Sequence, residues 1–228
     1  MKYETKSSIP ERNVSTRRAG CDRGSSLTFG KSMRIEYRVA RMDDVPALEA
    51  LIPLSARMLQ SGYYSPDLLD GAIGTVFGVD TQLIRDATYF VAVADAKIVG
   101  CGGWSRRKTL YGGDRAKKGE DPVRDPRTEP ALIRAFFVHP DYARKGIGRE
   151  FIRLSETAAF AAGFRMVEIV ATLAGEPLYA ACGYSVVERY SIDLVNGRHL
   201  PVVRMKRREE PNQTQEPTLP AVTSRAIV

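Results

Sequence analysis

Two glycines in one short basic turn are the feature of this sequence best suited to bind a ligand. An apolar run from Leu132 ends at Val138, and Pro140 separates it from the turn that contains Gly146 and Gly148. Backbone N–H groups at the start of a helix attract anions, and the helix dipole adds to that attraction. Glycine lets the backbone approach a phosphate closely. The order of strand, glycine turn and helix therefore predicts a phosphate-binding loop.

The residues after the turn predict the elements that position it. Apolar side chains recur at spacings of four and three, on one face of a helix that ends near Gly163. These side chains are Ile147, Phe151, Leu154, Ala158 and Ala161. Residues 164–170 then read as a second buried strand. Together they predict a βαβ-like unit, in which the loop before the helix lies at the carboxyl edge of the sheet.

The glycine spacing separates three kinds of phosphate loop. The P-loop pattern G-x-x-x-x-G-K-[ST] is absent. A dinucleotide fingerprint needs a third small residue where this chain has Phe151. Glu168 falls at the distance of a ribose-binding acid, but it lies inside the second predicted strand. The third pattern, Q/R-x-x-G-x-G/A after a strand ending in Val-x-Pro, fits residues 143–148 at all but the first position.

In two motifs the sequence resembles the GNAT superfamily of acetyl-CoA-dependent N-acetyltransferases. One is Val-His-Pro at residues 138–140 followed by the turn at 144–149, and the other is Tyr-x-x-x-Gly-Tyr from Tyr179 to Tyr184. Their separation and the strand order match the family. The resemblance implies an α/β fold in which a mixed, twisted sheet is flanked by helices on both faces. It also implies acetyl transfer from acetyl-CoA to an amine.

Two positions depart from the family pattern. Ala143 stands where the family has Gln or Arg, so a side chain that would brace the loop is missing. Thr172 stands where members often have Asn, and a hydroxyl replaces only part of the hydrogen bonding of an amide. Because the phosphate contacts in such a loop are mainly made by the backbone, we expect altered cofactor affinity rather than loss of activity.

The resemblance implies a set of cofactor-binding residues. Pantetheine would pair with the first strand where it diverges from the second, and the Val138 N–H is a candidate donor to the thioester carbonyl. The amides of the turn would hold the pyrophosphate, with charge supplied by its basic side chains. The expected residues are Phe136, Phe137, Val138, Arg144, Lys145, Gly146, Ile147, Gly148, Arg149 and Thr172.

The resemblance also places the catalytic groups. Tyr179 is at the position of the family's general acid, which protonates the leaving sulfur. Glu168 is the nearest candidate base, although a strand shifted by one residue would turn it away from the cleft. Arg134 and His139 are alternatives nearby, and a chain of water molecules is another. No metal is expected.

The acceptor site is less well defined by the sequence. Tyr63 and Tyr64, in the turn after the first helix, could line it, as could Trp104 at a strand end. Ordinary packing is the alternative for all three. Arg134 could hold an acidic acceptor.

Composition and charge restrict the class of protein. The chain of 228 residues is 43% hydrophobic, and its net charge is +7. The excess charge lies in residues 1–32, 105–130 and 204–228, which favours solvated segments over a nucleic-acid partner. Three scattered cysteines favour a reducing, cytoplasmic location. No apolar run is long enough to span a membrane.

We expect one GNAT acetyltransferase domain over residues 33–208, with a long basic loop at 105–130. Residues 1–32 and 209–228 are expected to be disordered. Residues 89–94 pair with 97–104, and Asn196-Gly197 predicts a closing hairpin that could mediate a homodimer. The expected reaction is attack of a small-molecule amine on acetyl-CoA in a ternary complex. The alternative is a non-catalytic acyl-CoA sensor or interaction module.

Overall fold

Residues 34–116 and 121–209 are described by the computed structural model of the chain. Their strands are β1 (Glu36–Val39), β2 (Tyr89–Ala94), β3 (Lys97–Ser105), β4 (Ala131–Val138), β5 (Met166–Thr172), β6 (Ser185–Asp193) and β7 (His199–Arg208). Their α-helices are α1 (Val45–Gln60), α2 (Pro66–Ala72), α3 (Thr81–Arg85), α4 (Ile147–Ala161) and α5 (Glu176–Ala180). The predicted disordered segment 1–32 lies outside the described residues, as does the predicted tail 209–228 except for Glu209, whose N–H donates to the Arg165 carbonyl at 3.0 Å.

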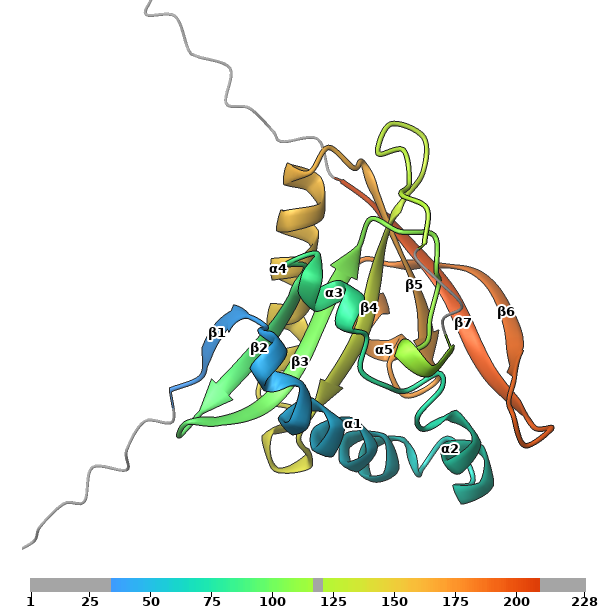
Figure 1. Ribbon diagram of the computed structural model, residues 1–228. Helices are drawn as coiled ribbons and strands as arrows, with labels where there is room; N and C mark the ends of the chain where they lie inside the picture. The colour runs from blue at the N-terminus through green and yellow to red at the C-terminus, as the bar shows by residue number, and fades with distance from the viewer. Residues whose placement is uncertain (1–33, 117–120, 210–228) are drawn as a thin grey trace, which may run out of the picture. The chain divides into compact units, whose positions relative to one another are not determined.

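The strands form one mixed sheet in the order β1-β2-β3-β4-β5-β7-β6 (Figure 1). Neighbouring strands are antiparallel except β4 and β5, which are parallel. Parallel neighbours require a crossover, and α4 supplies it. The predicted βαβ-like unit and both predicted hairpins, β2–β3 and β6–β7, are therefore confirmed.

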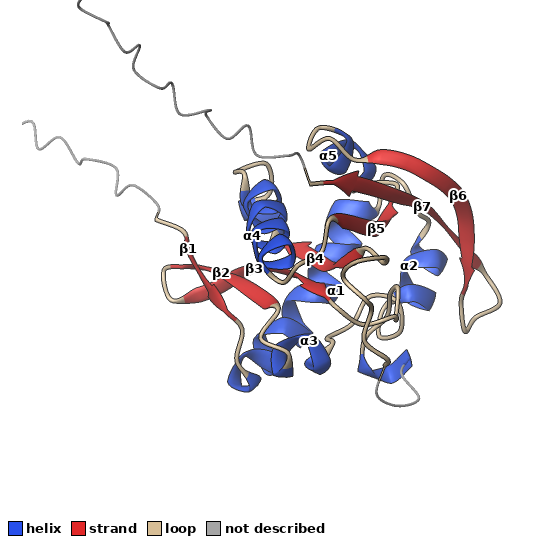
Figure 2. Ribbon diagram, turned by 90° about the horizontal axis from the view of Figure 1, so that it is seen from above, coloured by secondary structure: helices blue, strands red, loops and turns tan. Residues whose placement is uncertain are grey.

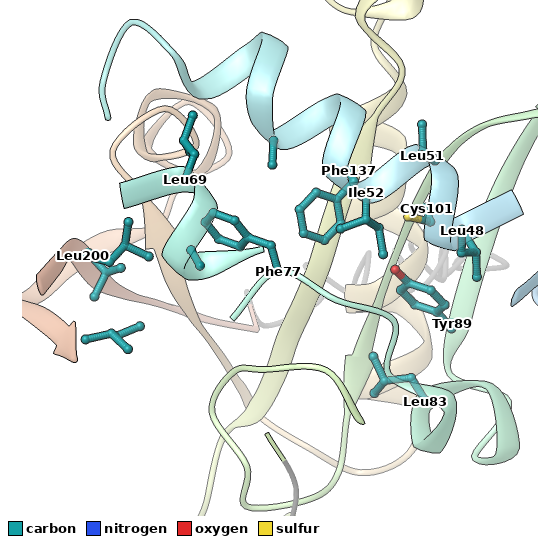
Figure 3. Close-up of a cluster of buried hydrophobic side chains, with 14 of the residues drawn as sticks. Leu48, Leu51, Ile52, Leu69, Phe77, Leu83, Tyr89, Cys101, Phe137 and Leu200 are labelled. Atoms are coloured by element: carbon teal, nitrogen blue, oxygen red, sulfur yellow. The ribbon is translucent and has the colours of Figure 1, made fainter. Parts of the chain in front are cut away.

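Helices cover both faces of the sheet, as Figure 2 shows. On one face, apolar side chains of α1, α2 and α3 pack around Phe77, Tyr89 and Phe137 (Figure 3). On the other face, α4 crosses β3, β4 and β5 and buries Phe151 and Ile152 against them. The predicted α/β fold, with a mixed sheet between two helical layers, is confirmed.

Two helices differ from the sequence prediction. Pro53 is expected to kink or divide the first helix, yet α1 runs undivided from Val45 to Gln60. An interior proline removes one backbone hydrogen bond, and burial of Leu48 and Ile52 against the sheet offsets this cost. A helix is expected over residues 172–183, with Pro177 near its start and Gly183 as its stop. The structure has only the five residues of α5, because β5 continues to Thr172 and residues 173–175 and 181–183 form turns.

The long loop between β3 and β4 is tied to the body of the domain by residues that precede residues 117–120. The Gly113 N–H donates to the Thr75 carbonyl at 2.9 Å. The Arg107 guanidinium forms an ion pair of 2.6 Å with Asp86, and both side chains are largely buried. These contacts place Gly113 beside the segment that follows α2 and Arg107 beside the end of α3.

Candidate active site

The sheet opens between β4 and β5. The two strands pair over only two residue pairs, of which Leu132 with Glu168 is the second. Both strands continue beyond this pair, β4 to Val138 and β5 to Thr172. Past the last pair, the facing main-chain groups of β4 and β5 no longer bond to each other. The result is a wedge with a free strand edge on each side, which a ligand with its own polar groups can enter.

A bulge in β4 lies at the start of this wedge. Ala135 has a φ of 58°, a backbone angle that residues other than glycine rarely adopt. The pairing of β3 with β4 shifts register between Cys101 and Gly103. The buried Tyr89 hydroxyl donates to the Ala135 carbonyl at 2.9 Å and holds the distorted residue in place. Because a bulge bends its strand, we attribute the divergence of β4 from β5 to this residue.

The glycines of β3 accommodate the bulge. A Cβ on Gly102 would lie 2.5 Å from the Phe136 ring, and one on Gly103 would lie 2.3 Å from the Thr88 carbonyl oxygen. Gly102 therefore leaves room for the Phe136 ring beside the bulge, and Gly103 lets β3 approach the start of β2 closely.

The basic turn leads from β4 into α4, and its two glycines are needed for different reasons. Gly146 precedes the first residue of α4 with a φ of 85°, and nothing lies within 4 Å of a Cβ built on it. Glycine is needed at this position because the backbone is left-handed, and not because space is short. A Cβ on Gly148 would instead lie 2.9 Å from a methyl carbon of Leu178. The first glycine shapes the turn, and the second lets α4 pack against α5.

A cleft of about 660 Å³ follows the wedge from this turn to the far end of α1. Its first end is formed by the turn and by the connection from β5 into α5. Its middle is formed by β4 and β5, and its second end by the C-terminal part of α1, residues 76–78 and residues 110–112. The volume is that of a pocket for a small molecule or cofactor.

Nine of the ten expected cofactor-binding residues line this cleft, and Lys145 does not. Its ammonium nitrogen lies 4.8 Å from the centre of the Tyr142 ring. The Thr172 hydroxyl accepts a hydrogen bond of 3.2 Å from the Gly175 N–H and so shapes the turn into α5. At the position where the family often has Asn, the Thr172 side chain therefore forms a hydrogen bond within the protein.

The Val138 amide differs from the expectation. It is a predicted donor to the thioester carbonyl, but it donates to the Ser55 hydroxyl of α1 at 3.1 Å. Ser55 is buried and lines the cleft. A carbonyl of the cofactor that took this amide would have to displace the Ser55 hydroxyl.

Tyr179 lies in α5 and lines the cleft beside Phe136, with ring centroids 6.1 Å apart. Burial raises the pKa of its hydroxyl well above the ordinary value of 10.0, and the neighbouring Cys182 adds a smaller effect in the same direction. The phenol therefore stays protonated at any physiological pH. A protonated hydroxyl at the wedge can donate a proton to a leaving group.

Glu168 is not among the residues that line the cleft. It belongs to the last paired position of β5, and its carboxylate faces Arg204 of β7, with an O–N distance of 3.9 Å. The structure therefore does not bring the expected base together with Tyr179. His139 is also absent from the cleft lining.

Of the residues expected at the acceptor, Tyr63 and Arg134 line the cleft, and Tyr64 and Trp104 do not. Tyr64 is buried, and its hydroxyl accepts from the Leu173 N–H at 2.8 Å and donates to the Pro201 carbonyl at 2.7 Å. Trp104 packs against Phe164 on the α4 side of the sheet. Tyr64 and Trp104 therefore contribute to packing, which is the alternative that the sequence leaves open for them.

Arg134 forms a buried ion pair. Its Nη1 lies 3.0 Å from a carboxylate oxygen of Asp80, and both side chains are at most 2% exposed. Its Nη2 donates to the Gly112 carbonyl at 2.6 Å. Burial lowers the pKa of Arg134, and the charge of Asp80 opposes that shift. The pair fixes the loop after β3 and the start of α3 against β4.

Asp80→Asn is expected to destabilise the fold by about 3 to 5 kcal/mol, because it leaves the Arg134 charge buried and uncompensated. Asn keeps the side-chain oxygen that accepts the Gln82 N–H at the start of α3. The matched control is Asp67→Asn, which breaks an exposed ion pair with Arg198 and should cost less than about 1 kcal/mol. Urea unfolding of both variants measures the difference, and equal costs would contradict the assigned role.

Several cleft residues are not identified by the sequence. Ser55 and Gln60 come from α1, and Tyr111 comes from the loop after β3. They lie far from the two motifs along the chain, and only the tertiary fold brings them to β4. The one sequence signal is the polar Ser55 and Gln60 on the buried face of an otherwise apolar helix.

Comparison with known proteins agrees with this geometry. Residues 85–186 match the family model described as an acetyltransferase (GNAT) domain. No curated protein sequence matches the chain. The matched residues extend from the end of α3 into β6 and include the wedge, the basic turn and Tyr179.

Solved structures with the same fold include three acetyltransferases. A GCN5-related N-acetyltransferase from Rhodopseudomonas palustris has 17% identity and a TM-score of 0.57, over 76% of this chain and 95% of that one. YncA from Salmonella typhimurium with acetyl-CoA has 15% identity and a TM-score of 0.54, over 81% of this chain and 99% of that one. PaiA N-acetyltransferase from Thermoplasma acidophilum with coenzyme A has 15% identity and a TM-score of 0.53, over 78% of this chain and 100% of that one.

The likenesses to solved structures establish the fold, and the family match adds the class. A mixed sheet opened between two parallel strands, with a glycine turn at one end of the opening, defines the GNAT architecture. Residues 85–186 match a GNAT acetyltransferase domain, and the described residues have the fold of solved GNAT acetyltransferases.

Proposed function

We propose that this protein transfers the acetyl group of acetyl-CoA to the primary amine of a small molecule in a ternary complex. The observation that carries the proposal is the wedge between β4 and β5, which runs from the basic turn to Tyr179. A pyrophosphate at the turn and a pantetheine along β4 would bring a thioester to the middle of the cleft. YncA from Salmonella typhimurium, which has the same fold, was solved with acetyl-CoA.

The reaction follows from the groups at the wedge. The amine nitrogen attacks the thioester carbonyl carbon, a C–N bond forms, and the C–S bond breaks. The nitrogen loses its proton to water, since no carboxylate is among the described residues of the cleft lining. Tyr179 gives its proton to the leaving sulfur and regains one from solvent. Residues Arg144 and Arg149 hold the phosphates by charge.

Calorimetric titration of acetyl-CoA into the full chain, followed by a thiol-release assay with a panel of amines, tests the proposal. We expect saturable binding of one acetyl-CoA per chain and thiol release that depends on the amine. Binding without amine-dependent thiol release would show a cofactor sensor instead. Absence of binding by the folded chain would reject the site itself.

The location and assembly belong to the same proposal. We place the enzyme in the cytoplasm without a metal. Among residues 34–116 and 121–209, no helix is long and apolar enough to cross a bilayer, and no group of side chains could hold a metal ion. A homodimer would use β6, which forms an edge of the sheet and exposes Val186 and Val187. Sedimentation analysis of the full chain tests that assembly.

A further inference from the structure

The second end of the cleft, away from the basic turn, has an apolar and aromatic wall. It is formed by Leu59, Tyr63, Val76, Phe77, Leu110 and Tyr111. Tyr63 is 54% exposed, Leu59 38% and Tyr111 36%. Burial of such side chains by a ligand is favourable, by about 25 cal/mol for each Å² of apolar surface removed from water. The wall therefore fits a ligand with an apolar body.

Free charge is absent from the described residues of this end. The charged side chains among the described cleft residues are Arg134, Arg144 and Arg149. Arg144 and Arg149 belong to the basic turn at the first end. The charge of Arg134 is compensated by Asp80 at 3.0 Å. A carboxylate or a second ammonium group on the acceptor would be desolvated here without an ionic partner, which is strongly unfavourable.

One buried polar atom at this end has no hydrogen-bond partner among the described residues. Gln60 is 8% exposed, and its side-chain oxygen forms no hydrogen bond within the described part of the chain. Gln60 lines the cleft at the end of α1, three residues before Tyr63. Its carboxamide can accept a hydrogen bond from an amine N–H after rotation about its last bond. A neutral amide suits an uncharged amine, which is the form that attacks a thioester.

We propose that the acceptor is a primary monoamine with an aromatic or branched aliphatic body and no other charged group. This inference rests on the proposed acetyl transfer and adds the class of substrate. The apolar wall binds the body, and Gln60 orients the nitrogen toward the middle of the cleft. Acceptors with a carboxylate or a second ammonium group are disfavoured by desolvation.

Three acceptors that share one body test this specificity in the full chain. They are 2-phenylethylamine, L-phenylalanine, which adds a carboxylate, and 4-(aminomethyl)phenylethylamine, which adds an ammonium group. We expect kcat/KM for either charged compound to be at least about 10-fold below that of 2-phenylethylamine. Gln60→Leu should lower kcat/KM for 2-phenylethylamine by about 10-fold, because the amine then meets no acceptor, and should leave the acetyl-CoA Kd unchanged.

A charge placed in the wall gives a sharper test. Tyr63→Glu should reverse the preference between the monoamine and the diamine, because its carboxylate would pair with the second ammonium group. The matched control is Met58→Glu, near the end of α1 and five residues before Tyr63, which is 60% exposed and is not part of the cleft lining. This control should keep the wild-type preference.

The outcomes separate this inference from the proposed function. Faster acetylation of the amino acid or the diamine by the wild type would overturn the inference and leave acetyl transfer established. The same preference in Tyr63→Glu and Met58→Glu would also overturn it. Acetyl-CoA binding without acetylation of any amine would overturn the proposed function, and the inference with it.

Discussion

Gly146→Asp is expected to weaken acetyl-CoA binding at least about 100-fold and to abolish turnover with it. The residue adopts a φ of 85°, so any side chain strains the turn. Its carboxylate would also stand at the start of α4, where the proposed pyrophosphate sits, and would repel it at close range. The measurement is calorimetric titration of acetyl-CoA into the variant and into the wild type.

Gly197→Asp is the control for backbone strain. Gly197 has a φ of 74° in the turn between β6 and β7, and nothing lies within 4 Å of a Cβ built on it. It is not among the residues that line the cleft. Aspartate at either position therefore meets a positive φ and open space. Wild-type affinity in Gly146→Asp, or equal losses in the two variants, would reject the basic turn as the phosphate site.

Tyr179→Phe is expected to lower kcat by about 100-fold and to leave the Kd of acetyl-CoA unchanged. The ring still packs against Phe136 and Tyr184, so the wall of the cleft is preserved. Only the proton for the leaving sulfur is lost. Because burial holds the pKa of this hydroxyl well above 10.0, loss of activity at high pH in the wild type should not appear below about pH 10.

Tyr184→Phe is the matched control for this variant. Tyr184 is buried, its ring centroid lies 5.5 Å from that of Tyr179, and it does not line the cleft. Removal of its hydroxyl should leave kcat within about threefold of the wild type. A normal kcat in Tyr179→Phe, with slow thiol release only in Tyr184→Phe, would show that Tyr179 is not the proton donor.

The part of the site that the sequence predicts is the part built from neighbouring residues. The turn at Gly146 and Gly148 combines a strand end, a backbone conformation and a helix start within a few residues. Tyr179 is predicted from the resemblance of a second short motif, residues 179–184, to the family pattern. Local chemistry of this kind leaves a readable pattern in the sequence, and nine of the ten expected cofactor residues line one cleft.

The acceptor end depends on long-range contacts that leave no such pattern. Arg134 reads as a free cation in the sequence, yet Asp80, more than fifty residues earlier, neutralises it in the fold. Tyr64 and Trp104 are aromatic residues near the expected pocket, and packing turns both away from it. The direction of Glu168 depends on the register of β5 beside β7, which strand periodicity alone does not fix.

The opening between β4 and β5 also affects how the domain responds to its ligand. The sheet consists of two parts, β1 to β4 and β5 to β7. Two residue pairs between β4 and β5 join these parts, and α4 packs across both. A ligand that fills the wedge takes the place of a strand between β4 and β5 and links the two parts of the sheet. At a concentration 100 times its Kd, such a ligand adds about 2.7 kcal/mol to the free energy of unfolding. The supply of cofactor in the surroundings would then set the mechanical stiffness of the enzyme, its resistance to proteases and its lifetime.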